Sequence, residues 1–156
     1  MTPVPPVREA AADDAPLLAR MLHDFNTEFE DPSPGVEVLS DRVAEFIEAD
    51  VKTYLLGGEG PDGFAQVDFV PSVWSDGPIA HLDELYVVPA QRGRGIGRAL
   101  MEAVLGLARE RGAAGAEVVT GEDDTEARGL YESVGFRNDV EGTDDARALF
   151  YELELR

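Results

Sequence analysis

Two stretches near the start of the chain repeat their apolar residues every three or four positions, which predicts two amphipathic helices. The first begins after Asp13 or Asp14, either of which can cap it, and has Pro16 in its first turn. It ends at the turn-rich segment 31–35, and the second helix follows. The apolar faces comprise Leu18, Met21, Leu22, Phe25 and Phe29 in the first helix and Leu39, Val43, Phe46 and Ile47 in the second.

The remaining apolar runs are shorter, and glycine or proline bounds most of them, which favours strands. We expect strands over 4–10, 52–57, 64–70 and 79–88, with 57–63 as a hairpin connection and 71–78 as a loop. A third helix follows residue 95, because its apolar residues from Ile96 to Leu107 share one face. Farther on, we expect strands over 116–120, from 136 and over 148–155, and a helix over 126–133. This order predicts a mixed α/β fold whose first half is antiparallel.

Segment 86–98 combines a strand, a proline and a glycine-rich turn. Gly93, Gly95 and Gly97 open the third helix, and three arginines are interspersed with them. Glycine accepts positive φ and leaves the backbone bare, so such a loop exposes N–H groups that favour a phosphate. Guanidinium groups also suit phosphate oxygens. The segment therefore predicts a pyrophosphate-binding turn; the alternative is a tight turn with solvated arginines.

Two other phosphate-binding glycine loops do not fit this segment. The dinucleotide fingerprint G-x-G-x-x-G, started at Gly93, requires glycine where Arg98 stands. The phosphate loop G-x-x-x-x-G-K-[ST] requires a lysine, and the only lysine of the chain is Lys52. The turn therefore belongs to neither class.

Length and composition limit the kind of protein. With 156 residues we expect a single domain over 1–156. The chain has no cysteine, which excludes disulfides, thiolate catalysis and cysteine-based zinc sites, and we expect no metal. No stretch approaches the roughly 20 apolar residues of a membrane span, and the first residues lack a signal-peptide pattern. We therefore expect a cytoplasmic protein without a membrane partner.

Acidic residues outnumber basic ones by 32 to 13, which gives a formal net charge of −19. This balance disfavours nucleic acid and anionic membranes as partners and favours cationic ligands such as polyamines. A solvating acidic surface explains the same charge without a ligand, so both interpretations stay open.

Two motifs carry a family resemblance. Val87-x-Pro89-x-x-Arg92-x-x-Gly95-x-Gly97 resembles the acetyl-CoA signature of the GCN5-related N-acetyltransferase (GNAT) superfamily. Residues 130–136, Leu-Tyr-Glu-Ser-Val-Gly-Phe, resemble that family's second signature, although Asp124 stands where the family usually has asparagine. The resemblance implies a mostly antiparallel twisted sheet of about seven strands, flanked by about four helices and splayed between strands four and five. It also implies acetyl-CoA as co-substrate and a primary amine as acceptor, and it leaves a homodimer open.

By this resemblance, the acyl-pantetheine arm lies in the splay and the glycine turn holds the diphosphate. The backbone near the end of the fourth strand pairs with pantetheine and meets the thioester carbonyl, while Asp124 accepts a hydrogen bond from pantetheine or caps its helix. The cofactor-binding candidates are Leu85, Tyr86, Val87, Arg92, Gly93, Arg94, Gly95, Ile96, Gly97, Arg98 and Asp124.

Acetyl transfer to an amine needs a base for the ammonium proton and an acid for the departing thiolate. Regular alternation along the fourth strand places His81 and Asp83 on one face and Glu84 on the other. We expect Asp83, where some small-molecule acetyltransferases of the family carry an acid, to orient the amine and accept its proton. His81 is the second candidate base and Glu84 the third, and Tyr131 stands at the family's general-acid position. An ordinary polar strand end and a packed helix tyrosine are the alternatives.

We expect the acceptor between the first two helices and the 71–78 loop, where an acidic segment favours a cationic small molecule. The substrate-binding candidates are His23, Asn26, Phe29 and Trp74. With no cysteine to carry an acetyl group, direct attack in a ternary complex is favoured over a covalent intermediate. The alternatives are a non-catalytic acyl-CoA-binding module that senses the cofactor and a protein N-terminal or lysine acetyltransferase.

Overall fold

The computed structural model describes residues 3–139 and 146–156 and divides into two compact units, Met1–Val118 and Val119–Arg156. The first unit holds β1 (Val7–Glu9), α1 (Ala15–Glu28), α2 (Val36–Glu48), β2 (Thr53–Gly57), β3 (Gly63–Val70), β4 (Ile79–Val87), α3 (Ile96–Glu110) and β5 (Gly115–Val118). Single 3₁₀ turns, Ala12–Asp14 and Pro89–Gln91, precede α1 and α3. The second unit holds α4 (Thr125–Ser133). The mixed α/β class is therefore confirmed.

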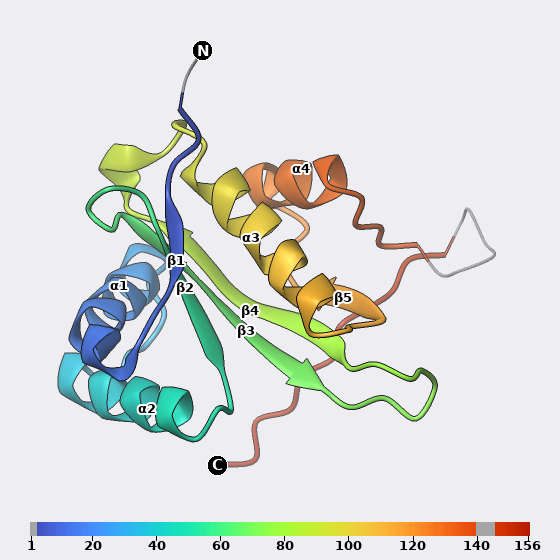
Figure 1. Cartoon of the computed structure of the whole chain (residues 1–156), viewed down its shortest axis with the longest axis horizontal. Coiled ribbons are helices and arrows are strands. Elements are labelled where there is room, and N and C mark those ends of the chain that lie inside the picture. Colours follow the sequence, from blue (N-terminus) through green and yellow to red (C-terminus); the bar gives the residue numbers. More distant parts are fainter. Residues whose placement is uncertain (1–2, 140–145) are drawn as a thin grey trace. The chain divides into compact units, whose positions relative to one another are not determined.

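One sheet organises the first unit, with strand order β1-β2-β3-β4-β5 (Figure 1). The first four strands pair antiparallel, and β5 pairs parallel to β4. Helices α1 and α2 cover one face, and α3 covers the other (Figure 1). A side chain at Gly57 of β2 would collide with Leu100 of α3 at 2.9 Å, so this glycine permits the close approach of α3 to the sheet.

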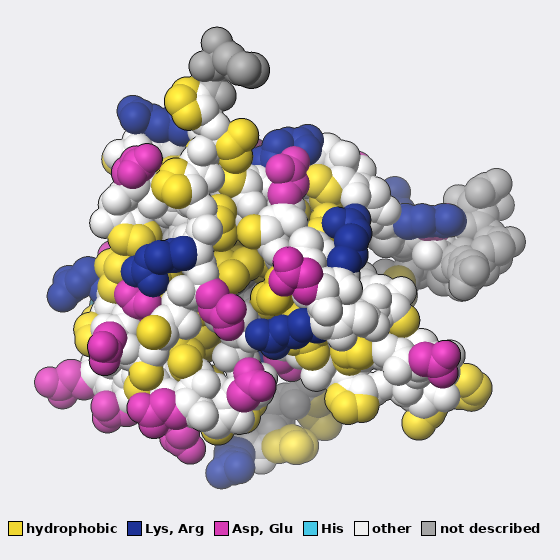
Figure 2. All heavy atoms as spheres, in the orientation of Figure 1, with side chains coloured by type: hydrophobic (Ala, Val, Ile, Leu, Met, Phe, Trp, Pro, Cys, Tyr) yellow, Lys and Arg dark blue, Asp and Glu magenta, His cyan; other side chains and the backbone are white. Residues whose placement is uncertain are grey.

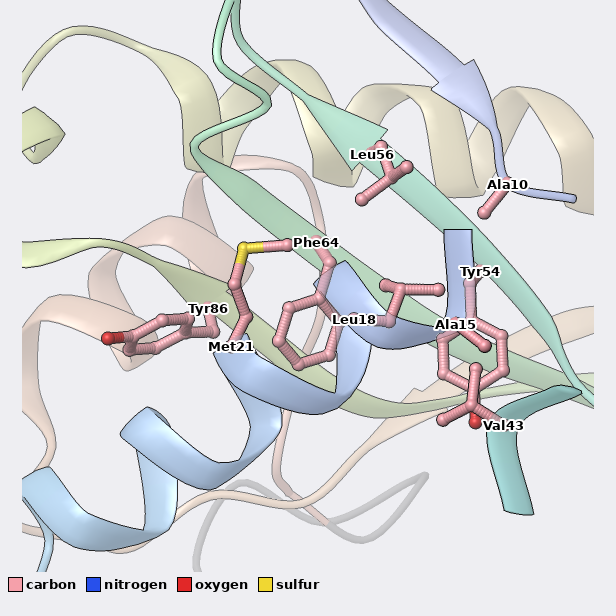
Figure 3. Close-up of a cluster of buried hydrophobic side chains, with 9 residues drawn as sticks. All are labelled: Ala10, Ala15, Leu18, Met21, Val43, Tyr54, Leu56, Phe64 and Tyr86. Carbon is pink, nitrogen blue, oxygen red and sulfur yellow. The ribbon is translucent and has the colours of Figure 1, made fainter. Parts of the chain in front are cut away.

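The core beneath α1 and α2 follows from the alternation predicted for the strands. Tyr54, Leu56, Phe64 and Tyr86 project from β2, β3 and β4 toward the face that Leu18 of α1 covers (Figure 3). Phe64 and Leu18 are fully buried, and Tyr86 is 5% exposed. Burial of each such side chain contributes roughly 1.5–3 kcal/mol, so this cluster holds α1 against the strand that carries the candidate site.

Strand β4 contains a bulge that regular alternation does not predict. The register pairs Gln66 of β3 with Glu84 and Val67 with Leu82, so Asp83 is the extra residue. Because a bulge shifts the side-chain period by one, Glu84 lies on the same face as His81 rather than opposite to it. The prediction that put Glu84 on the other face was therefore wrong.

The parallel pairing between β4 and β5 is short. It joins Ile79–Leu82 to Gly115–Val118 and ends there, while β4 continues to Val87. Residues 83–87 of β4 thus have no strand neighbour on that side among the described residues. This unpaired edge is consistent with the opening between strands four and five that the resemblance implied.

The expected strands of the C-terminal part do not form. Residues 136–139 and 146–156 contain one isolated bridge, Asp139 to Arg147, and otherwise no strand. The apolar side chains from Leu149 to Leu155 are 67–86% exposed. Alternation makes a strand only where a neighbouring backbone completes the hydrogen bonds, and within the described part of its unit this segment has one such bond, from the Ala148 N–H to the Asn138 carbonyl at 2.9 Å. The described sheet accordingly has five strands, not about seven.

Candidate functional site: the β4–α3 turn and the bulged face of β4

The glycine turn links β4 to α3 through Pro89–Gln91 and two left-handed residues. Gly93 has φ +78° and Gly95 has φ +86°, a region that glycine alone enters at no steric cost. Gly95 is the N-cap residue of α3, and its carbonyl accepts the first helical hydrogen bond, from Ala99 at 3.0 Å. The glycine-rich turn at the start of the third helix is therefore confirmed, and its binding of a pyrophosphate stays a prediction.

The backbone N–H groups of residues 93–97 donate no hydrogen bond to any described residue. Two left-handed glycines turn part of this row toward a common side, and the positive end of the α3 dipole lies beside it. Residues 93–95 are exposed. An exposed row of unpaired donors at a helix N-terminus is suited to binding an anion.

The three arginines of the turn have different partners. Arg92 donates from Nε to the Val87 carbonyl at 2.9 Å and from Nη2 to Glu28 Oε1 at 2.8 Å. Its guanidinium also lies 5.6 Å from the centre of the Tyr86 ring. Arg98 contacts Glu102 at 3.4 Å one helical turn away, and Arg94 makes no ion pair with a described residue. Arg92 thus ties the turn to α1, whereas Arg94 is available for a ligand.

The cofactor candidates on β4 lie where the strand has an open edge. Leu85, Tyr86 and Val87 pair with Ala65, Phe64 and Gly63 of β3, and β5 does not reach them. The Tyr86 ring stacks on Phe25 of α1 with centroids 5.0 Å apart. The Tyr86 side chain therefore belongs to the core, and the backbone of residues 85–87 has no strand partner on the β5 side among the described residues.

The bulge gathers charged side chains on the face of the sheet that α1 and α2 cover farther along. Lys52, just before β2, donates to Asp83 Oδ2 at 2.5 Å, and Gln66 Nε2 donates to the same oxygen at 3.3 Å. Asp68 lies 3.8 Å from the Lys52 ammonium. Burial and the neighbouring Asp83 raise the pKa of Asp68. The expected base Asp83 is thus already neutralised by Lys52.

Glu84 is the carboxylate of this group that makes no hydrogen bond or ion pair with a described residue. Burial raises the pKa of Glu84, and the charge of Asp83 raises it further, while Lys52 lowers it. A carboxylate whose pKa is raised accepts a proton more readily than an ordinary carboxylate does. Tyr54, two strands away on the same face, is 1% exposed, and burial together with Asp83 and Glu84 raises its phenol pKa.

His81 lies farther from the turn and has its own partner. Its Nε2 is 3.0 Å from Glu117 Oε2 on β5, the residue opposite it in the parallel register. The structure therefore brings His81, Asp83 and Glu84 onto one face, as a group that the sequence had split between two faces.

The acceptor candidates are spread over two places. His23 Nδ1 contacts Ser33 Oγ at 2.8 Å, and Asn26 Nδ2 donates to the Pro32 carbonyl at 2.8 Å, so both hold the α1–α2 connection. Phe29, at the C-cap of α1, is 55% exposed and lies 5.3 Å from Phe25. Trp74 is 93% exposed in the loop before β4. Since β4 has nine residues, that loop begins about 25–30 Å from the glycine turn.

Two candidates belong to the second unit. The Asp124 side chain accepts a hydrogen bond from the Ala127 N–H at 3.1 Å and caps α4. Tyr131 lies on α4, with its ring edge-on to Phe136 at 5.9 Å. The capping role proposed for Asp124 is therefore realised within its unit.

No sequence pattern pointed directly to Lys52, Gln66 and Asp68 as site residues. Two signals could have indicated this part of the site. Lys52 is the single lysine of an acidic chain, and the spacing of Leu82 and Leu85, two apolar residues three positions apart in a strand, indicates a bulge. Ala65 and Val67, their β3 partners, share a face, so both leucines can share it only across a bulge.

Neither a metal site nor a membrane span is found in the described part of the chain. No group of three or more His, Cys, Asp or Glu side chains in 3–139 and 146–156 is arranged to hold a metal ion. Among the same residues, no helix has the length and apolarity to cross a membrane.

These features define a mixed α/β protein with a glycine-rich turn after a bulged strand that is longer than its parallel neighbour. Residues 18–136 match the acetyltransferase (GNAT) family, and the chain belongs to that family. The match runs from α1 to the end of α4, so it includes the turn, the bulge and Tyr131.

Three relatives give the comparison detail. Streptothricin acetyltransferase of Streptomyces lavendulae is 34% identical over 109 residues, which are 69% of this chain and 49% of that protein. Thialysine N-epsilon-acetyltransferase of Caenorhabditis elegans is 28% identical over 128 residues, 81% of this chain and 79% of that one. A crystal structure from Arthrobacter sp. FB24, assigned provisionally as an acetyltransferase, has a TM-score of 0.88 at 44% identity and covers 98% of this chain and 96% of its own. The chain thus spans about half of the streptothricin enzyme.

Proposed function

We propose that this protein transfers the acetyl group of acetyl-CoA to a primary amine of a cationic small molecule. The observation that carries the proposal is the row of unpaired N–H groups at residues 93–97, because it offers the diphosphate of coenzyme A a ready set of donors. Arg94 and Arg98 add charge beside it, and the open edge of β4 at residues 85–87 offers backbone groups to the pantetheine arm.

We infer that Glu84 is the general base. It is half-buried and has no partner among the described residues, and its pKa is raised, whereas Asp83 is ion-paired with Lys52 and His81 Nε2 contacts Glu117 at 3.0 Å. The neutral amine attacks the thioester carbonyl directly, the C–N bond forms as the C–S bond breaks, and the amine proton passes to Glu84 directly or through water. A protonated group must then supply the thiolate with a proton, and Tyr131 is our candidate from its position in the family's second signature.

The acceptor class rests on charge and on the relatives' names. Three carboxylates share one face of the sheet at the bulge, and streptothricin and thialysine acetyltransferases are named for small molecules. Acetylation of a basic protein N-terminus or lysine is the second candidate, favoured by the acidic exposed face of α2 (Glu37, Asp41, Glu45 and Glu48).

The test is thiol release from acetyl-CoA with a panel of polyamines, aminoglycosides, amino acids and basic peptides, next to calorimetric titration with coenzyme A. Gly95→Val, which must leave φ +86°, should weaken coenzyme A binding at least tenfold. Gly106→Ala is the matched control, because an added Cβ there meets no atom within 4 Å.

Each outcome of that test points one way. Tight coenzyme A binding without thiol release on any amine would favour the non-catalytic sensing module. Release with basic peptides alone would favour the protein substrate. No binding of coenzyme A by the wild-type chain would overturn the proposal.

A further inference from the structure

Lys52 is the single lysine of the chain, and its ammonium is held between two carboxylates at the bulge. The Nζ atom lies 2.5 Å from Asp83 Oδ2 and 3.8 Å from Asp68 Oδ1. The side chain is 22% exposed, so it lies partly within the sheet surface rather than free in solvent. The Lys52–Asp83 ion pair is therefore a partly buried feature of the bulged face.

Its geometry requires both the bulge and a long side chain. Lys52 precedes β2, and Asp83 belongs to β4, so the contact crosses β3, a span of two strand spacings or about 10 Å. Asp83 reaches this face because it is the extra residue of the bulge. The bulge thus places the Asp83 carboxylate on the face where the Lys52 ammonium contacts it.

The carboxylates around Lys52 are not fully satisfied by it. Asp68 Oδ1 is shielded from solvent and accepts no hydrogen bond from any residue in the described ranges. Lys52 is too far from this oxygen to donate to it. Glu84, next to Asp83 in the chain, has no ion-pair partner among the described residues. One built-in ammonium therefore faces three carboxylates.

We propose that Lys52 determines the acceptor selectivity of this site: its ammonium fills the Asp68–Asp83 pair and leaves Glu84 as the carboxylate that receives the acceptor's amine. The inference rests on the proposed acetyl transfer to a cationic amine. With Lys52 in place, the site takes one ammonium at this position. Without it, the Asp68–Asp83 pair becomes open to a second ammonium, and a diamine gains over a monoamine of the same length.

The test compares 1,4-diaminobutane with butylamine, which has the same carbon chain and one charge fewer. Dissociation constants are measured by calorimetry for the full chain, at fixed ionic strength, with coenzyme A present. Lys52→Met keeps the apolar stem without the charge, Lys52→Gln serves if that variant does not fold, and Lys52→Arg keeps the charge. Arg109→Met, on the exposed end of α3, removes one positive charge elsewhere and is the matched control.

We expect the preference for diamine over monoamine to rise roughly two- to fivefold in Lys52→Met or Lys52→Gln, the size expected for one partly exposed ion pair. Lys52→Arg and Arg109→Met should keep the wild-type preference, which a merely structural role of Lys52 would not predict. A folded Lys52→Met or Lys52→Gln with an unchanged preference overturns the inference, as does a wild-type protein that binds neither amine.

Thiol release by the same variants separates this inference from the proposed function. A shifted binding preference with no acetyl transfer to any amine would sink the catalytic assignment and leave the role of Lys52 in amine selection standing. Acetyl transfer with the same binding preference in wild type and Lys52→Met would support the catalytic assignment and overturn the role of Lys52 in amine selection.

Discussion

At the scale of single residues, the partners of each acid decide its chemistry more than its position in the motif does. Asp83 stands where the family resemblance favours a base, yet Lys52 and Gln66 already bind its Oδ2. Glu84, third among the candidates from sequence, is the one that burial leaves with a raised pKa and no partner in the described chain. Sequence supplied Asp83 and Glu84 but not the partners of Asp83, because Lys52 lies just before β2 and Gln66 lies on β3.

Glu84→Gln tests the assignment of the base. We expect kcat to fall roughly 10²- to 10⁴-fold, the usual contribution of a general base, while the affinity for coenzyme A stays unchanged. Asp83→Asn should lower kcat less, because Lys52 already neutralises Asp83. Steady-state kinetics at saturating acetyl-CoA measure both, and an equal loss in the two variants would contradict this ranking.

The raised pKa of Glu84 also predicts that Glu84→Gln, which should lose activity, gains folding stability. Since the folded-state pKa of Glu84 is raised, wild type loses stability as pH rises from the ordinary glutamate pKa through the raised one. Glutamine has no such loss, so the variant should gain stability relative to wild type over that window and keep the gain above it. Urea unfolding from pH 4 to pH 8 measures the difference, and a gain that shrinks with rising pH would contradict burial as the cause.

At the scale of elements, periodicity and turn residues predicted the four α-helices and the five strands that form within 3–139 and 146–156. The bulge in β4 was missed because the period-two rule assumes a regular strand, and only the register against β3 shows that Leu82 and Leu85 share a face. The strand expected over 148–155 failed for a different reason. Alternation there describes side chains, whereas a strand needs backbone partners that sequence does not specify.

The N-cap of α4 gives one element-scale prediction. Asp124→Ala removes the acceptor of the Ala127 N–H, so the free energy of unfolding should fall by about 1 kcal/mol. Asp124→Asn, which restores the residue usual in the family and keeps an oxygen at the cap, should stay within about 0.5 kcal/mol of wild type. Urea denaturation followed by circular dichroism measures both, and equal losses would show that the charge rather than the cap matters.

The link between β1 and α1 gives a second prediction. Arg8 donates to both oxygens of Asp14 at 2.8 Å, and this contact, with the Ala11 N–H, lowers the pKa of Asp14 to about 2. A lowered carboxyl pKa stabilises the fold above the ordinary value, and the gain is lost as pH falls from about 4 to about 2. Asp14→Asn should therefore reduce stability by about 0.5–1 kcal/mol at pH 7, an amount limited by the exposure of Arg8. The reduction should be the same at pH 5 and pH 8, and a reduction that varies over that range would contradict the pair as its source.

At the scale of the whole molecule, a formal charge of −19 surrounds a small basic turn. Acidic side chains gather over the α2 end of the visible face (Figure 2). Like charges at this density destabilise the compact state, and salt screens them over about 10 Å at 0.1 M. The charge that attracts a cationic acceptor therefore also weakens the fold.

Salt should consequently act in two directions. Raising NaCl from 20 to 500 mM should increase the Tm by several degrees, while the KM for a dicationic acceptor rises several-fold. Differential scanning fluorimetry and steady-state kinetics measure the two effects. The rise in Tm should be smallest near the pI of about 4.2, where the net charge is close to zero, and a rise of the same size there would show that self-repulsion is not the cause.

The chain has a single tryptophan, and that indole is 93% exposed in the loop before β4. Its emission spectrum should already resemble that of free indole in water, so fluorescence is a poor gauge of global unfolding for this protein. The same exposure makes it a clean optical reporter of the loop alone: a blue-shifted emission on adding a ligand would mean that something apolar has covered Trp74.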